Sequence, residues 1–236
     1  MKFPAAASCA LALMAACAGQ TEGPIFSIAD GLYPWVEAPT SIDPQSENTP
    51  QFNDPTVTFA LAKGDRRSTL RTGDEWRIGQ SYLIGFDIKV DPARLAGERV
   101  VVSQLVGSGP PEAKIAAVEL DAKRGVTVFG RQCIPSEQLA EWHRVEMRIK
   151  LSNGDTGYLE VFCDRKPVWA RMDIRTTQPP VCRLREGCTV DVAKPARFEW
   201  RIGLMSKRPV RQPVRVDMRK LHQREIFYVP NRVGTL

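Results

Sequence analysis

Three polar side chains stand two residues apart on one short segment: Arg67, Thr69 and Arg71. Side chains two apart on a β-strand point to the same face, so these three would lie together. A guanidinium donates paired hydrogen bonds to a carboxylate or sulfate and stays protonated at neutral pH. The segment therefore predicts a site that holds an acidic group rather than one that removes a proton. The alternative is that Arg67 and Arg71 pair with structural carboxylates such as Asp74 or Glu75.

The elements that would position these residues are β-strands. The stretch from Glu141 to Val168 shows it best, because apolar residues alternate there with charged ones: Val145, Met147, Ile149 and Leu151 against Arg144, Glu146, Arg148 and Lys150. This alternation is typical of a strand with one buried face. Asn153-Gly154 then predicts a turn, and alternation resumes after Gly157, which indicates an antiparallel hairpin.

Short strands separated by turn signals continue along the chain, and helix is scarce. We expect strands, besides the hairpin, over 57–61, 67–71, 82–90, 100–106, 114–120, 125–129, 196–205 and 213–218. One helical turn is expected at Ser136–Glu141, with Ser136 as its cap. The pattern predicts a single all-β antiparallel domain, a sandwich or jelly roll, over residues 55–236.

The N-terminus carries an export signal in this interpretation. Lys2 precedes an apolar, Ala-rich run that ends at Ala16, directly before Cys17. The run is short for a membrane span, so residues 1–16 are predicted to be a lipoprotein signal peptide, with Cys17 as the lipidated residue. An ordinary secretory signal is the alternative. Residues 17–54, rich in proline, are expected to form a tether and irregular lead-in. The protein would be held by its lipid at the bacterial cell envelope, at the outer membrane.

Export bears on the cysteines, because an oxidising compartment favours disulfides over metal sites. Four cysteines remain in the predicted domain, and they allow three connectivities: Cys133, Cys163, Cys182 and Cys188. We favour Cys133 with Cys163 and Cys182 with Cys188. The rival is a zinc site, but the sequence holds only two histidines, His143 and His222. No metal or cofactor is predicted.

The charge of the chain suggests a class of partner. The net charge is +6 and the pI about 9.1, with much of the excess after Arg165, including Lys207 and Arg208. A positive field attracts polyanions. For an exported protein these are acidic polysaccharides or lipopolysaccharide, and no nucleic-acid partner is expected. The alternative is a solvated basic surface with no ligand.

Several segments together resemble one family, the polysaccharide lyases of the heparin lyase I type, which fold as a concanavalin A-like β-jelly roll. The resemblance runs from about Arg67 to Arg208, and the order of the segments carries it: Arg67 to Asp74, Tyr82 to Pro92, Val101 to Gln104, Trp142 to Val161, and Phe198 to Leu204. It implies that Gln104 and Arg201 join Arg67, Thr69 and Arg71 in a glycan groove. It also implies that Trp142 and His143 are structural, with Trp142 packed in the core. His222 matches no motif and is expected at the surface.

The sequence departs from the family at its chemistry. Such lyases neutralise a uronate carboxylate, remove a carbon-bound proton with His, Tyr or Lys, and protonate the leaving oxygen with Tyr. Arg201 stands at the family's Lys, Met205 at its Tyr, Val106 at its His, and Thr69 at its groove Glu. The catalytic residues are therefore unknown, and the tyrosines at 82, 158 and 228 are not placed by sequence.

The sequence thus favours an exported, monomeric jelly roll that binds an acidic, uronate or sulfated, polysaccharide without efficient cleavage. The candidate contacts are Arg67, Thr69, Arg71, Gln104, Arg201, Lys207 and Arg208. One alternative is an active polysaccharide lyase performing β-elimination, which predicts a His or Tyr near Arg201. Another is a structural envelope lipoprotein, which predicts that Arg67, Arg71 and Arg201 are satisfied by internal carboxylates.

Overall fold

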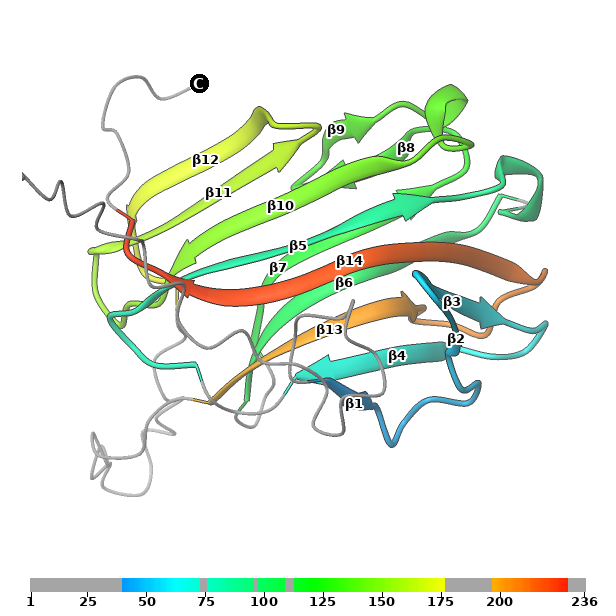
Figure 1. The fold of residues 1–236 in the computed structure, drawn as a ribbon, viewed down its shortest axis with the longest axis horizontal. Coiled ribbons are helices and arrows are strands. Elements are labelled where there is room, and N and C mark those ends of the chain that lie inside the picture. The colour runs from blue at the N-terminus through cyan, green and yellow to red at the C-terminus, as the bar shows by residue number, and fades with distance from the viewer. Residues whose placement is uncertain (1–39, 73–75, 96, 109–112, 177–196, 229–236) are drawn as a thin grey trace, which may run out of the picture.

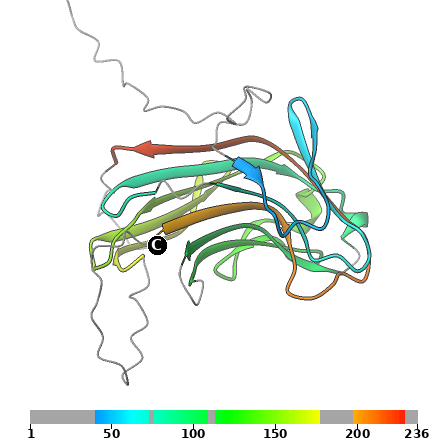
Figure 2. The same cartoon turned by 90° about the horizontal axis from the view of Figure 1, so that it is seen from below.

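The structure is a computed structural model that describes residues 40–72, 76–95, 97–108, 113–176 and 197–228. Two seven-stranded antiparallel sheets pack face to face, as Figure 1 and the edge view in Figure 2 show. In spatial order, sheet A contains β12 (Lys166–Ile174), β11 (Gly157–Cys163), β10 (His143–Lys150), β5 (Ser81–Lys89), β14 (Val214–Ile226), β3 (Thr56–Leu61) and β2 (Gln51–Asn53). Sheet B contains β1 (Thr40–Ile42), β4 (Arg67–Thr72), β13 (Arg197–Met205), β6 (Arg99–Ser108), β7 (Ala113–Asp121), β8 (Gly125–Val128) and β9 (Arg131–Ile134).

Apolar side chains at every second position of the strands form the core between the sheets. On β10, Val145, Met147 and Ile149 are buried while the charged residues between them are half-buried on the outer face. From sheet B, Trp200 is fully buried, and its indole Nε1 donates a hydrogen bond to Ser103 Oγ at 2.9 Å. A buried indole needs such an acceptor, because an unpaired buried donor costs about 1–3 kcal/mol. The predicted all-β jelly-roll class is confirmed.

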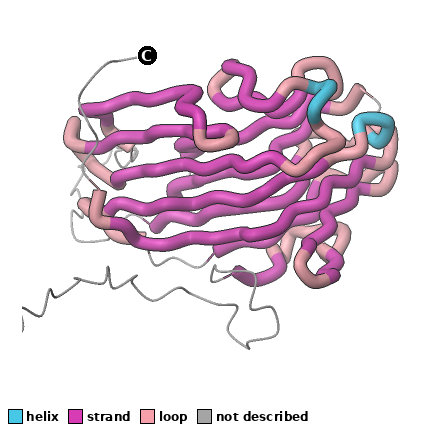
Figure 3. The backbone as a smooth tube through the Cα atoms, turned by 45° about the horizontal axis from the view of Figure 1, so that its top comes forward, coloured by secondary structure: helices cyan, strands magenta, loops and turns pink. Residues whose placement is uncertain are grey.

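Among the described residues, helix is confined to two short 3-10 turns at one end of the sandwich, drawn in cyan in Figure 3: η1 (Pro92–Arg94) and η2 (Ser136–Gln138). The second coincides with the predicted helical turn, but its cap differs from the prediction. Pro135 occupies the N-cap, and Ser136 Oγ donates instead to the Lys123 carbonyl oxygen at 3.1 Å. The serine therefore ties η2 to the β7–β8 turn rather than capping it.

Strand pairing begins earlier and ends later than the sequence pattern suggested. β1 and β2 lie inside the stretch 17–54 that was expected to be an irregular lead-in, and they pair with β4 and β3. At the other end, β14 runs to Ile226 through an irregularity at Lys220, whose φ is +50°. The bulge puts buried Met218 and Leu221 three residues apart instead of two, which broke the alternation that prediction relied on.

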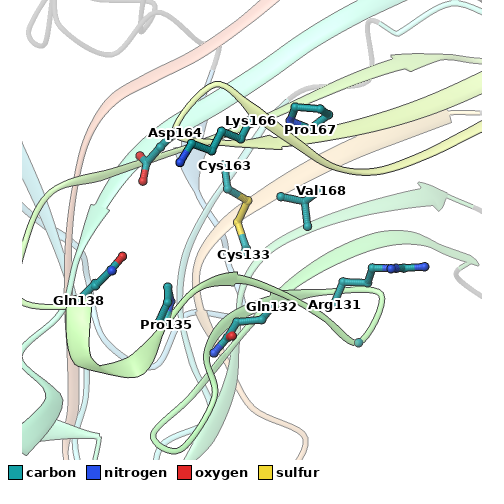
Figure 4. Close-up of a pocket in the computed structure, with 11 residues that line it drawn as sticks. Arg131, Gln132, Cys133, Pro135, Gln138, Cys163, Asp164, Lys166, Pro167 and Val168 are labelled. Carbon is teal, nitrogen blue, oxygen red and sulfur yellow. A yellow bond between two sulfur atoms is a disulfide. The ribbon is translucent and has the colours of Figure 1, made fainter. Parts of the chain in front are cut away.

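A disulfide joins the two sheets near their free edges. Cys133 on β9 of sheet B is bonded to Cys163 on β11 of sheet A, with Cα atoms 5.6 Å apart, as Figure 4 shows. The predicted pairing of these two cysteines is confirmed. The other predicted pair, Cys182 with Cys188, lies outside the described residues.

Candidate functional site

Three candidate residues form one row across sheet B. The register places Arg71 on β4 opposite Arg201 on β13, and Arg201 opposite Gln104 on β6. Their neighbours Leu70 and Ile202 are buried in the core, so the row lies on the outer face of the sheet. Neighbouring strands are about 4.8 Å apart, so the three side chains span only about 10 Å. We call Arg71, Arg201 and Gln104 the arginine row.

A single carboxylate, that of Glu199, is shared by both arginines of the row. Glu199 Oε1 accepts from Arg201 Nε, and Glu199 Oε2 lies 3.9 Å from Arg71 Nη1. The side chains of Arg201 and Glu199 are 10% and 11% exposed, whereas that of Arg71 is 41% exposed. Arg71 is therefore the guanidinium of the row that a ligand in solution reaches most readily.

Arg67 and Thr69 belong to a different group, centred on Asp43. Arg67 Nη1 and the Thr69 hydroxyl each donate to Asp43 Oδ2 at 3.0 Å, and the Gln45 backbone N–H donates to Oδ1 at 2.9 Å. Burial raises the pKa of Asp43, but these hydrogen bonds and the Arg67 charge outweigh it and lower the pKa below its ordinary value. Thr69 is fully buried. The hydroxyl of Thr69 is thus committed to Asp43, and the expectation that it contacts a glycan is wrong.

The carboxylates that pair with the arginines are not the ones that the sequence suggested. Asp74 and Glu75, the carboxylates suggested by sequence, lie outside the described residues. The partners in the structure are Asp43, just after β1, and Glu199, on β13. The structural-lipoprotein alternative predicts this pairing of the three arginines with carboxylates of the protein itself.

The last two candidates, Lys207 and Arg208, lie apart from the row. They line an open hollow of about 880 Å³ that continues past Met205, which faces Arg67 at the far end of β4. Both side chains are exposed. The hollow also contains Arg99, but that guanidinium is paired with Glu119. Lys207 and Arg208 therefore add positive charge to this end of sheet B without sharing the arginine row's contacts.

The histidine and tyrosine side chains of the described residues, which could exchange a proton, lie elsewhere. Both histidines, and the three tyrosines in the described part of the chain, belong to sheet A or directly follow it: His143, His222, Tyr82, Tyr158 and Tyr228. On sheet B, the positions matched to the family's His and Tyr are Val106 and Met205, both buried. Neither side chain can transfer a proton, so the arginine row can hold an acidic group but has no described His or Tyr beside it.

A second hollow, of about 750 Å³, lies beside the disulfide and is drawn in Figure 4. Its one described carboxylate, Asp164, is already engaged in the fold. Asp164 Oδ2 lies 2.8 Å from His143 Nδ1, and Oδ1 accepts from the Arg144 backbone N–H at 2.8 Å. Burial raises the pKa of Asp164, but these hydrogen bonds lower it below its ordinary value. His143 also bonds the Gln138 carbonyl oxygen at 2.8 Å, so its role is structural, as expected.

Sheet A carries a charged network on its outer face. The buried carboxylate of Asp87 lies 3.0 Å from Arg144 Nη1, 3.2 Å from Arg219 Nε and 3.5 Å from Lys220 Nζ. The Arg219 guanidinium stacks on the ring of Trp142, 4.3 Å from its centroid. Trp142 is half-buried at this surface, so its expected place in the core is wrong.

His222 is part of this network, which corrects the expectation of an exposed histidine. Its side chain is 9% exposed, its Nδ1 lies 3.1 Å from the Lys220 carbonyl oxygen, and Arg144 lies beside the ring. A Cβ at Gly85 would come within 2.5 Å of the imidazole Cε1, so the ring occupies the space that this glycine leaves. Burial and the Arg144 charge lower the pKa of His222 to about 4, although the Lys220 hydrogen bond opposes them.

This shift predicts a loss of stability in mild acid. Between about pH 6.5 and pH 4 the unfolded chain protonates His222 while the folded protein does not, so the free energy of unfolding falls as pH drops through this window. The full effect is about 3 kcal/mol. Urea unfolding at pH 7, 5.5 and 4.5 should show this decline, and His222→Asn should flatten it. An equal decline in both proteins would contradict the assignment. Asp43 and Asp164 do not confuse the test, because their lowered pKa values act below about pH 4.

The described residues contain no group of three or more His, Cys, Asp or Glu side chains that could hold a metal ion. Among them, no helix has the length and apolar character needed to cross a bilayer.

Comparison with known proteins places the fold. No protein-family model and no curated protein matches this chain. Among solved structures, the endo-β-1,4-glucuronan lyase of the fungus Trichoderma reesei is 14% identical, with a TM-score of 0.53 over 81% of this chain and 89% of that enzyme. The alginate lyase Aly36B, solved as a variant with an alginate trisaccharide, is 13% identical, with a TM-score of 0.57 over 82% of this chain and 96% of that one.

A third similar structure is the alginate lyase A1-II′, a member of polysaccharide lyase family 7. It is 12% identical, with a TM-score of 0.50 over 74% of this chain and 81% of that enzyme. These neighbours are glucuronan and alginate lyases, so the finer resemblance to the heparin lyase I type stays a prediction. At such low identity the similarity concerns the fold, and this chain has the antiparallel β-jelly-roll fold found in polysaccharide lyases.

Proposed function

We propose that this protein binds a uronate-containing polysaccharide on the outer face of sheet B and does not cleave it efficiently. One observation carries the proposal. The arginine row offers an accessible guanidinium at Arg71 beside Arg201 and Gln104, while the matched acid and base positions hold Met205 and Val106. A guanidinium can hold a sugar carboxylate through paired hydrogen bonds but cannot accept the proton that β-elimination releases.

The fold supports the class of ligand. Solved neighbours of this fold are named as lyases of glucuronan and alginate, and one was solved with an alginate trisaccharide. Fold alone does not assign function, so the choice of uronate polymers as ligands rests on the row's chemistry as well. Glu199 determines how tightly we expect the ligand to bind. Because a ligand carboxylate would compete with Glu199 for Arg71 and Arg201, we expect modest affinity that weakens as salt rises.

A structural role in the cell envelope is the second candidate, and the ion pairs favour it. Arg67, Arg71 and Arg201 all lie within 4 Å of an internal carboxylate, Asp43 or Glu199. If the pairs serve only the fold, removing one of these charges would change stability and leave glycan binding unaffected. The two candidates therefore differ in a measurable result.

Replacing Arg71 with glutamine tests the proposal. We expect about a tenfold loss of affinity for alginate and glucuronan, since a hydrogen bond to a charged group contributes about 1.5–3 kcal/mol. Binding can be measured by isothermal titration calorimetry at low and moderate salt. Arg215→Gln is the matched control, because Arg215 is 45% exposed and also lies near one carboxylate, Asp217, but on sheet A. Its affinity should remain at the wild-type value.

The same samples separate the three functions. Ultraviolet absorbance of an unsaturated uronate product, lost in Arg201→Gln, would establish a lyase and overturn the non-catalytic proposal. Binding without this absorbance, weakened by Arg71→Gln alone, would support the proposal. Absence of both signals would leave the structural role.

Export and lipidation at Cys17 are proposed from residues 1–17 of the sequence, and labelling with a radioactive fatty acid in cells is their direct test.

A further inference from the structure

An aromatic pair lies at the open edge of the sandwich. Phe129, in the turn between β8 and β9, stacks on Trp169 of β12, with ring centroids 4.2 Å apart and planes 22° apart. β9 and β12 are the edge strands of sheets B and A, and both lie at the top of Figure 1. Phe129 is 44% exposed and Trp169 is half-buried. The stack therefore presents aromatic surface to solvent between the two sheet edges.

The backbone of Phe129 makes this exposure unusual. Its φ is +49° and that of Gly130 is +78°, which is the left-handed pair typical of a two-residue hairpin turn. Asn or Gly normally occupies the first position, and a bulky residue there is strained. The turn itself gains nothing from a phenyl ring, so the ring's contact at the edge is the physical reason for having phenylalanine here.

Cations surround the stack. A pocket of about 370 Å³ at this edge is lined by Phe129 and Trp169 together with Lys114, Arg171 and Arg175. The Arg171 guanidinium lies 5.8 Å from the Trp169 ring centroid. Among the described residues, no acidic side chain lines the pocket, and neither Arg171 nor Arg175 forms a salt bridge. Lys114 has one carboxylate nearby, Glu119, at 3.9 Å.

The edge pocket differs from the arginine row in whether a carboxylate of the protein already lies beside its guanidiniums. In the row, Glu199 lies beside both guanidiniums, whereas the described lining of the edge pocket combines two guanidiniums with apolar side chains and holds no carboxylate. An aromatic surface beside unpaired cations suits a ligand with one apolar face and one negative group. A uronic acid has this form, because its ring carries a face of C–H bonds and its C5 substituent is a carboxylate.

We propose that the edge pocket is a second binding site for a uronate residue. The apolar face of the sugar lies against Phe129 and Trp169, and its carboxylate meets Arg171 and Arg175. The inference rests on the proposed function for the class of ligand, but it assigns a site on other strands. Since β7 of sheet B contributes both Ala117, opposite Gln104 in the arginine row, and Lys114 in the pocket, one strand connects the two sites, although Trp169 and Arg171 of the pocket belong to β12 of sheet A.

The test titrates the purified full chain with a glucuronan tetrasaccharide, measured by calorimetry and by tryptophan emission. Arg171→Gln/Arg175→Gln should weaken binding about tenfold. The matched control is Lys123→Gln/Arg124→Gln, which removes the same charge from two exposed side chains at the other end of β8. The control should bind within about twofold of wild type. Trp169→Phe keeps an aromatic ring, so it should retain binding while losing the ligand-induced change in emission.

Each result has one meaning, provided that unfolding midpoints confirm folded variants. Weaker binding in the edge variant alone, with the emission change lost in Trp169→Phe, supports the second site. Equal binding in the edge variant and its control, or an emission change that survives in Trp169→Phe, overturns it. If the wild type binds but only Arg71→Gln weakens binding, this inference fails and the proposed function stands. If the wild type binds no uronate polymer, both fail.

Discussion

Replacing Gly203 with alanine is expected to lower the free energy of unfolding by about 3–5 kcal/mol. Gly203 lies on β13 at an irregularity between Ile202 and Met205, with a φ of +122° that other residues rarely adopt. An added Cβ would also clash with the Ser68 carbonyl oxygen and lie 2.5 Å from Phe59 Cδ1. Both atoms belong to packed strands, so neither can move without disturbing the core.

A second glycine with a positive φ, Gly64, separates the cost of the steric clash from the cost of the backbone conformation. Gly64 has a φ of +99°, but a Cβ there would meet nothing within 4 Å. Gly64→Ala should therefore cost only about 1 kcal/mol, the conformational part of the effect. Urea unfolding of both variants at neutral pH measures the difference. Equal losses would mean that β13 relaxes around the new methyl group and that close packing at Gly203 is not the cause.

Removing the disulfide is the second large effect. Cys133→Ser/Cys163→Ser should lower the free energy of unfolding by about 3.5 kcal/mol, because the crosslink closes a loop with a sequence separation of 30 residues and restricts the unfolded chain. The bond also joins β9 of sheet B to β11 of sheet A, near the edge where Phe129 meets Trp169. Chemical unfolding of the oxidised wild type and the variant measures the loss.

The wild type treated with a reducing agent is the control for the substituted cysteines. It should unfold at the midpoint of the double variant, because both lack the same crosslink. Cys182 and Cys188 are present in each protein, so only the behaviour of the double variant isolates the bond between Cys133 and Cys163. A variant as stable as the oxidised wild type would show that contacts between the sheets, rather than the crosslink, hold this edge together.

The alternation of apolar and polar residues was enough to predict most strands, but it failed for a few of them. Val145, Met147 and Ile149 alternate cleanly because β10 has one face in the core, so its bounds were predicted closely. β12 shows no such alternation, since an edge strand buries little of either face. The later half of β14 was missed because the bulge at Lys220 shifts which residues face the core.

By itself, the sequence determined that the protein is an antiparallel β-sandwich, because the two-residue period of buried side chains is local. Its resemblance to the lyases implied that Arg71, Arg201 and Gln104 share one surface, and the strand register places them in one row. Only the tertiary structure decided the electrostatic state of that surface. Asp43, just after β1, reaches Arg67 on β4, and Glu199 on β13 reaches Arg71 on the neighbouring strand. His222 is buried by residues of β5 and β10. Charge neutralisation and burial depend on which side chains meet in space, and strand pairing brings together residues that are remote in sequence.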